Sequence, residues 1–244
     1  MPEERLEVAR AQMLELFPEG FEESDTGNGV ELAAYTDAGG EERLWAAFGT
    51  VAAEAVPLGW DERWRAFHRP VRVGPLWVGP PWERPPPDAT PVVIDPGRAF
   101  GTGGHPTTRL CLRLLLELEL GSLLDVGCGS GVLAIAASRL GFSPVVALDH
   151  DPAALEAAGR NALANGAAID VRRGDALEEV LPDCDVVVAN VSTAFVSQVA
   201  QRVRAGSLLV SGYLESERPA AAGYEPIRRL SQDGWAADLL RRDQ

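Results

Sequence analysis

Short apolar runs alternate with segments of helical spacing over the second part of the chain. The runs SLLDVG, PVVALD, CDVVVAN and SLLVSGY are almost continuously apolar, as expected of strands that are buried on both faces of a parallel sheet. Segments such as DPAALEAAGRNALANG lie between them and place apolar residues on one helical face. This alternation predicts an α/β fold with a doubly wound, mostly parallel sheet, which we expect to contain seven strands.

Residues that prefer the ends of helices and turns support this division into strands and helices. Asp151 precedes a proline at the start of one helical segment, which is the arrangement of an N-cap followed by the first helical residue. Gly141 and Gly166 stand where two helices should end. The tail YEPIRRLSQDGWAADLLRRD reads as two strands around an Asp-Gly turn. An antiparallel hairpin is therefore predicted to complete the sheet.

The front of the chain has a different character. Residues 1–58 mix helical, hairpin-like and strand-like segments, which predicts a small α+β domain that we assign to substrate recognition. Seven of the 18 prolines fall within residues 74–91, so we interpret residues 59–91 as a Trp/Pro-rich linker and 92–244 as the main domain. A unit as small as the first domain is marginally stable alone. Five of the six tryptophans lie before residue 92, and they favour an interdomain seam over a partner surface: Trp45, Trp60, Trp64, Trp77 and Trp82.

The amino-acid composition limits the classes of partner that the protein is expected to bind. The formal net charge is −14, and all 22 basic residues are arginines, so a phosphate backbone would be repelled and direct binding of nucleic acid is not expected. A basic protein would be attracted. The three cysteines form no CxxC pair, and the sequence contains neither a signal peptide nor an apolar run of membrane length. We expect a reduced, cytoplasmic protein with no membrane contact, and a monomer is favoured.

The stretch DVGCGSG at 125–131 is the first candidate for chemistry. A strand should end at Asp125, three glycines allow a sharp turn, and a helix follows at once. The amides and positive dipole end of that helix are expected to hold a carboxylate or phosphate. Asp149 ends the next strand, 22 residues after Gly127, where its carboxylate can accept both hydroxyls of a ribose. An adenosine-containing ligand is therefore predicted.

Two ligand classes remain at this point, a dinucleotide and S-adenosylmethionine. The spacing D-x-G-x-G-x-G differs from the G-x-G-x-x-G of dinucleotide sites and favours S-adenosylmethionine. Asn190 ends the fourth strand, where an acceptor amine would meet the methyl group. The alternative for Asn190 is a cap of the helix that begins near Ser192.

With the segment PGRAFGTGGHPTT at 96–108, the sequence resembles a known family, the ribosomal protein L11 methyltransferases (PrmA). The segment is similar to that family's P-G-x-A-F-G-T-G-x-H-x-T-T loop, and DVGCGSGVLAIAA, ALDHDP and VVVAN follow in the family's order. The resemblance covers the chain from about Trp60 onward. It implies a class I methyltransferase fold and transfer of methyl groups from S-adenosylmethionine to lysine or N-terminal amines of a basic ribosomal protein of the large-subunit stalk base.

The resemblance also implies residue roles. It assigns Thr108, Gly127, Asp149 and Asn190 to the cofactor contacts. We expect Asn190 and His105 to be the catalytic residues. Phe100, Thr102, Gly103 and His105 belong to the loop that closes over the cofactor and excludes water. We add three further residues to the expected cofactor site: Asp125, Gly129 and Asp175.

Several alternatives stay open at this stage. His105 is favoured as a loop-orienting hydrogen bonder over a general base, and the sequence has no metal-ligand pattern around it. The chain enters a helical segment almost at once, whereas family members begin with a strand, so a reduced or rearranged substrate domain is expected. Residues 191–193 read VST and lack the Pro-Pro-aromatic run of adenine and glutamine methyltransferases. Methylation of another protein or small-molecule amine, a nicotinamide-dependent oxidoreductase and a binding module without catalysis are the competing functions.

Overall fold

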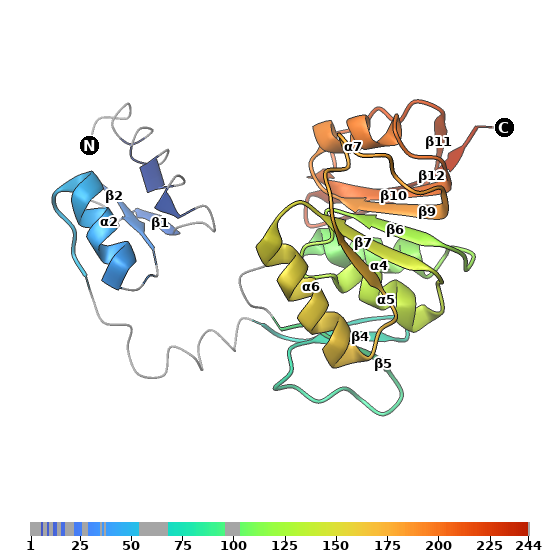
Figure 1. Cartoon of the computed structure of the whole chain (residues 1–244), viewed down its shortest axis with the longest axis horizontal. Helices are drawn as coiled ribbons and strands as arrows, with labels where there is room; N and C mark the ends of the chain where they lie inside the picture. Colours follow the sequence, from blue (N-terminus) through green and yellow to red (C-terminus); the bar gives the residue numbers. More distant parts are fainter. Residues whose placement is uncertain are drawn as a thin grey trace. The chain divides into compact units, whose positions relative to one another are not determined.

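The structure is a computed structural model of the chain that divides into two compact units, Met1–Asp61 and Glu62–Gln244 (Figure 1). The residues that it describes are 6, 9, 12, 13, 16, 17, 22–25, 29–34, 36, 38–53, 68–95 and 103–243.

The first unit combines a hairpin with a helix. Strands β1 (Glu22–Asp25) and β2 (Val30–Ala33) pair in antiparallel register, and α2 (Ala38–Phe48) follows them. Its buried apolar residues include Met13 and Phe17. This α+β content agrees with the sequence prediction for the front of the chain.

The second unit is built on a seven-stranded sheet of order β11-β12-β10-β9-β6-β7-β8. The five strands from β6 to β10 run parallel to one another, whereas β12 is antiparallel to both β10 and β11. The predicted α/β fold with a mostly parallel, seven-stranded sheet is therefore confirmed. The strands are β6 (Leu123–Val126), β7 (Val145–Asp149), β8 (Asp170–Arg173), β9 (Cys184–Asn190), β10 (Ala205–Leu214), β11 (Tyr224–Gln232) and β12 (Trp235–Arg242).

Helices cover both faces of this sheet (Figure 1). Val186 and Val188 of β9 join the apolar cluster that contains buried residues from 110–115, 132–137 and 158–162, while Val187 and Ala189 join the cluster that contains Val196 and Val199. The alternation explains why the strands are apolar at nearly every position, since both faces are buried. The helices are α4 (Pro106–Leu115), α5 (Val132–Leu140), α6 (Pro152–Asn165) and α7 (Thr193–Ala200).

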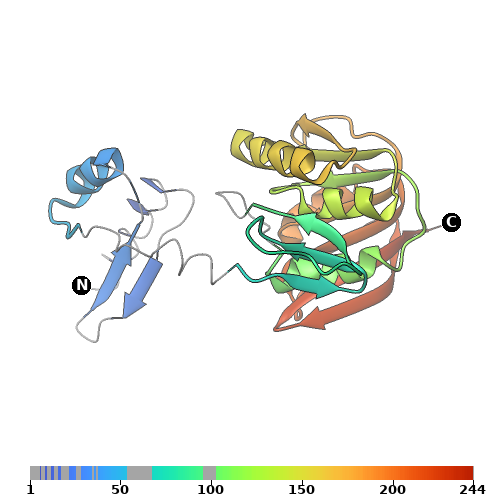
Figure 2. The same cartoon turned by 90° about the horizontal axis from the view of Figure 1, so that it is seen from below.

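A second, three-stranded sheet corrects the linker prediction. β3 (Val71–Val73), β4 (Leu76–Gly79) and β5 (Thr90–Val93) form a sheet of order β3-β4-β5, drawn in teal in Figure 2. Leu76 and Val78 are buried in the same cluster as α4, α5 and α6. The interpretation of this segment as a linker was therefore wrong for 71–79 and for the start of β5. The prolines occupy the connections and the edge strand β5, where a missing amide donor is tolerated.

The expected helix ends and the terminal hairpin are confirmed. The Asp151 side chain accepts a hydrogen bond from Ala153 N at the start of α6, and Gly141 and Gly166 end α5 and α6 in the left-handed conformation. The turn between β11 and β12 consists of two residues with positive φ, at 52° and 80°. This is the geometry that an Asp-Gly hairpin turn favours.

Candidate functional site

The strand order reverses at β6, which has β7 on one side and β9 on the other. In open α/β sheets, ligands bind outside the carboxyl ends of the strands at this point. A pocket lies there, and it receives residues from the ends of three parallel strands and from α7. Its lining consists of Val126, Gly127, Leu148, Asp149, His150, Gly174, Asp175, Ala176, Leu177 and Phe195.

The glycine loop, residues 127–131, joins β6 to α5 beside this pocket. Three glycines of the loop have positive φ values, of 69° at Gly127, 54° at Gly129 and 79° at Gly131. Residues that carry a side chain rarely adopt this conformation. Gly127 N donates to Leu148 O at 2.8 Å, so the loop is attached to the end of β7. Three consecutive reversals of this kind need glycine at alternate positions, as the sequence provides.

Asp125 lies under this loop rather than in the pocket lining. Its buried carboxylate accepts a hydrogen bond from Ala134 N in the first turn of α5, at 3.1 Å. Burial raises the pKa of Asp125 to about 7, the hydrogen bond from Ala134 N opposes this shift, and nearby Asp149 adds to it. The helix N-terminus was expected to hold a carboxylate of the ligand. Here a carboxylate of the protein itself takes one of those amides.

Asp149 and Asp175 line the pocket together. The Asp149 carboxylate is 8% exposed and accepts from Gly129 N and from Asp151 N, both at 3.0 Å. Asp175 accepts from Leu177 N at 2.8 Å. Phe195 of α7 adds an aromatic wall. A fixed carboxylate beside apolar and aromatic walls is a suitable environment for a nucleoside, whose sugar presents hydroxyls and whose base is flat.

Asn190 ends β9 at the level of the glycine loop. Ala189 of β9 pairs with Val126 of β6 in the sheet. The residues that follow them, Asn190 and Gly127, therefore stand side by side at the carboxyl ends of two adjacent strands. Ser192 is the N-cap of α7 and accepts from Phe195 N at 3.4 Å. The alternative interpretation of Asn190 as the cap of that helix was therefore wrong.

Two expected site residues carry buried polar atoms without partners. Asn190 Oδ1 and Thr108 Oγ1 have no hydrogen-bond partner among the described residues. The third such atom, Arg109 Nε, belongs to a side chain that pairs with Asp233 through Nη2. A buried polar atom without a partner costs about 1–3 kcal/mol. A ligand that supplies hydrogen-bonding groups to Thr108 and Asn190 would remove that cost, so both residues fit a polar ligand.

His105 begins α4 and caps it. Its Nδ1 accepts from Thr107 N at 3.3 Å and lies 2.8 Å from Thr107 Oγ1, and its ring meets Trp235 edge-on at 4.8 Å. Burial, and secondarily the charge of Arg109, lowers the pKa of His105. This geometry favours an orienting role over a general base. Gly103 lies two residues before it with a φ of 90°, whereas Phe100 and Thr102 lie outside the described residues.

The model of the family described as Ribosomal protein L11 methyltransferase (PrmA) matches residues 13–242. The chain belongs to this family. It is 43% identical over 202 residues to the ribosomal protein L11 methyltransferase of Symbiobacterium thermophilum, with 75% of this chain and 66% of the relative covered. The corresponding protein of an Exiguobacterium species is 33% identical over 211 residues, with 78% and 67% covered. The chain thus spans about two thirds of the length of these relatives.

A solved structure supports the same assignment. The ribosomal protein L11 methylase from Lactobacillus delbrueckii subsp. bulgaricus superposes with a TM-score of 0.65 at 28% identity, covering 72% of this chain and all of that one. The predicted resemblance to PrmA and the class I methyltransferase fold are both confirmed. The family match extends further toward the N-terminus than the resemblance predicted from about residue 60.

Sequence reasoning missed two asparagines of this PrmA family member. Asn161 of α6 donates to Ser130 O at 2.9 Å and accepts from Asp95 N at 3.1 Å. Asn165, one turn later, accepts from Val93 N at 2.7 Å and donates to Val93 O at 2.6 Å. The sequence indicated them only by two asparagines spaced by four residues within an alanine-rich helical segment. They connect the glycine loop to the end of β5, which leads into the segment at 96–108.

Two negative findings apply to the part of the chain that the structure describes. No group of three or more His, Cys, Asp or Glu side chains is placed to hold a metal ion there. No helix in those same ranges has the length and apolar character needed to span a bilayer.

Proposed function

We propose that this protein transfers methyl groups from S-adenosylmethionine to amino groups of ribosomal protein L11. The observation that carries the proposal is the family match over residues 13–242, whose relatives are named for this reaction. The same match leaves a nicotinamide-dependent oxidoreductase without support. Lysine side chains and the N-terminal amine are the acceptors that the proposal includes.

The pocket residues divide the work of holding the cofactor. Asp149 would accept hydrogen bonds from the ribose hydroxyls, Gly127 would let the cofactor approach the backbone closely, and Asp175, which lines the same pocket, would face the nucleoside. Thr108 Oγ1 and Asn190 Oδ1, which are buried without partners, bind polar groups of the cofactor or of the acceptor. When bound, S-adenosylmethionine would supply a methyl group on a positively charged sulfur: the S–C bond breaks as the new N–C bond forms, and S-adenosylhomocysteine leaves as a neutral thioether. The protein supplies alignment and exclusion of water, which together are worth effective molarities of about 10⁵ M or more.

The acceptor amine has to arrive uncharged. At pH 7, removing a proton costs about 4.6 kcal/mol for a lysine of pKa near 10.4 and about 1 kcal/mol for an N-terminal amine of pKa near 7.7. Asn190 Oδ1, buried without a partner among the described residues, would accept an N–H of the amine and so orient the nitrogen lone pair for the transfer. His105 has its Nδ1 engaged at the start of α4, so the proposal assigns it to orientation and not to proton removal.

Recognition of the protein substrate belongs in this proposal to the unit Met1–Asp61. The net charge of −14 favours a basic ribosomal protein over nucleic acid. An acceptor that is part of the ribosome also supports the cytoplasm as the place of reaction. The proposal assigns cofactor binding to the unit Glu62–Gln244, which contains Asp149, Asn190 and Thr108.

The test is direct. The purified protein is incubated with L11 and S-adenosylmethionine labelled in its methyl group, and the products are mapped by mass spectrometry. We expect label on lysine or N-terminal nitrogens of L11 and none on L11 whose amines have been acetylated beforehand. Label on acetylated L11, or an L11 that stays unmodified, would overturn the proposed acceptor.

A further inference from the structure

The end of β10 is packed directly against the residue that follows Asn190. Val191 N donates to Ser211 O at 2.9 Å, and the register of β10 against β12 shifts between Ser211 and Tyr213. Gly212, at this bulge, has a φ of 100°, and a side-chain carbon there would lie 2.2 Å from Val191 O. The bulge therefore brings two backbones into contact at the candidate site.

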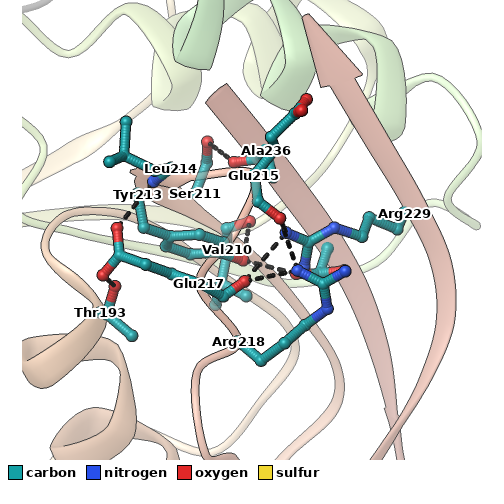
Figure 3. A network of polar contacts seen from close by, with 11 residues as sticks. Thr193, Val210, Ser211, Tyr213, Leu214, Glu215, Glu217, Arg218, Arg229 and Ala236 are labelled. Carbon is teal, nitrogen blue, oxygen red and sulfur yellow. Dashed lines mark hydrogen bonds and ion pairs between the residues drawn. The ribbon is translucent and has the colours of Figure 1, made fainter. Parts of the chain in front are cut away.

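Glu217 connects the start of α7 to the same end of β10 (Figure 3). Its Oε1 accepts from Thr193 Oγ1 at 2.6 Å, and its Oε2 accepts from Leu214 N at 2.8 Å. These two hydrogen bonds lower the pKa of Glu217, so the side chain is ionised at neutral pH. Thr193 is three residues after Asn190. One carboxylate thus holds both the end of β10 and the first residue of α7.

Two arginines hold the turn that carries Glu217. Arg229 Nη2 donates to the carbonyl oxygens of Glu215 and Glu217, at 2.8 and 2.9 Å. Arg218 Nη1 donates to the same two oxygens, at 2.6 and 2.8 Å. In Figure 3, dashed lines join the guanidinium of Arg229 to this turn. The turn is consequently fixed by its backbone as well as by the Glu217 side chain.

A buried carboxylate anchors Arg229. Asp238 of β12 is 4% exposed, and its Oδ2 accepts from Arg229 Nη1 at 2.7 Å and from the hydroxyl of Tyr213 at 2.9 Å. Burial, then Asp238, raises the pKa of Tyr213, which keeps that hydroxyl protonated. Buried ion pairs seldom add much stability, but a fully hydrogen-bonded one restricts the chain to a single arrangement.

We propose that Glu217 is a positioning residue for methyl transfer: it fixes the segment from Asn190 to Thr193 against the end of β10. The proposal rests on the function proposed above, in which Asn190 meets the acceptor amine. Alignment of the amine depends on the position of Asn190, whereas the ribose contacts are made by β7 and the glycine loop. Loss of Glu217 should therefore slow turnover much more than it weakens cofactor binding.

The chain offers a matched control on the same strand. Asp185, at the other end of β9, accepts from Ser122 N at 2.7 Å and from Ser122 Oγ at 2.6 Å. Its pKa is also lowered by these bonds. Like Glu217, Asp185 accepts hydrogen bonds from one backbone amide and one hydroxyl. It lies at the amino end of β9, whereas the candidate site lies at the carboxyl end of that strand. Asp185→Ala thus removes an equivalent structural contact far from Asn190.

The experiment compares Glu217→Ala, Glu217→Gln and Asp185→Ala in the full chain. For Glu217→Ala we expect kcat on L11 to fall by about tenfold or more, with the Kd for S-adenosylmethionine, measured by calorimetry, within about threefold of the original. Glu217→Gln retains an acceptor for Leu214 N and should keep kcat within about threefold. Asp185→Ala should lower the melting temperature comparably and leave kcat unchanged.

Amide hydrogen exchange gives a second readout that needs no substrate. Glu217→Ala should speed exchange at Val191, whose amide is bonded to Ser211 O, and Asp185→Ala should not. Unchanged exchange at Val191, or turnover that falls equally in both alanine variants, would overturn the positioning role. If the unaltered protein fails to methylate L11, the proposed function fails, and the exchange comparison alone decides the role of Glu217.

Discussion

The side chain of Asn161 donates a hydrogen bond to the carbonyl oxygen of Ser130, 2.9 Å away, in the middle of the glycine loop. The same amide accepts from Asp95 N at 3.1 Å, so one buried residue of α6 ties that loop to the chain that leaves β5. Asn161 therefore contacts both glycine-rich segments, at Asp95 of the segment 95–108 and at Ser130 of the segment 125–131. The same ligand is expected at both segments.

Asn161→Ala should weaken binding of S-adenosylmethionine by about tenfold, because the buried carbonyl of Ser130 in the glycine loop loses its partner, at roughly 1–3 kcal/mol. Calorimetric titration of the folded variant measures the change. Ser138→Ala is the control: Ser138 Oγ accepts from Ala168 N at 3.1 Å, a contact of the same kind away from the loop. Equal cofactor affinity in the Asn161 variant and the control would show that Asn161 supports only the fold.

Much of the parallel sheet was predictable because its strands are buried on both faces. Each of β6, β7, β9 and β10 appears in the sequence as an apolar run, and Asp149 and Asn190 could be placed at strand ends by the polar residue that stops the run. The sheet formed by β3, β4 and β5 escaped prediction, because its strands are three or four residues long and are surrounded by prolines.

The supporting contacts were not predictable for a different reason. Asn161 and Ser130 are 31 residues apart in the chain, and Thr193 and Glu217 are 24 residues apart. No local propensity links such pairs, since they meet only after the strands have assembled. Asp125 was assigned to the cofactor from its motif, but its carboxylate accepts a hydrogen bond from Ala134 N in the first turn of α5. That contact depends on the direction in which α5 leaves the glycine loop, and the motif does not specify this direction.

Asp149→Ala should weaken the binding of S-adenosylmethionine by about 1.5–3 kcal/mol, which is the value of hydrogen bonds to a charged group. NADH should not displace the cofactor from the unaltered protein. Because Asp149 also accepts from Gly129 N and Asp151 N, Asp149→Asn is measured alongside to preserve one acceptor for the loop. Tight binding of NADH, or normal cofactor binding by the alanine variant, would contradict the assignment.

Gly212→Ala should destabilise the protein by more than about 3 kcal/mol, since the added carbon would lie 2.2 Å from Val191 O in addition to adopting a strained φ. Gly223→Ala separates the two effects. Gly223 also has a positive φ, of 81°, but no atom lies within 4 Å of its added carbon, so only about 1–2 kcal/mol of backbone strain is expected. Urea unfolding measures both variants. Similar losses would mean that β10 can move away from Val191 at little cost.

The last prediction concerns pH and Asp125. Its pKa of about 7 in the folded chain lies above the ordinary value of 3.8 for this side chain, so the folded state binds more protons than the unfolded state between these two values. Stability contributed by the protonated carboxyl is therefore complete below about pH 4 and is lost as the pH rises through 7. Asp125→Asn removes this titration but keeps an acceptor for Ala134 N.

Urea unfolding of both proteins at pH 5, 6, 7 and 8 tests the sign. The free energy of unfolding of the asparagine variant, relative to the unaltered protein, should increase from pH 5 to about pH 7 and level off toward pH 8, because only the unaltered protein must bury a carboxylate at the higher values. Comparing the two proteins at each pH cancels the other titrating groups. A relative stability that is constant with pH, or that decreases, would show that Asp125 is ionised in the folded protein throughout, stabilised by the amides at the start of α5.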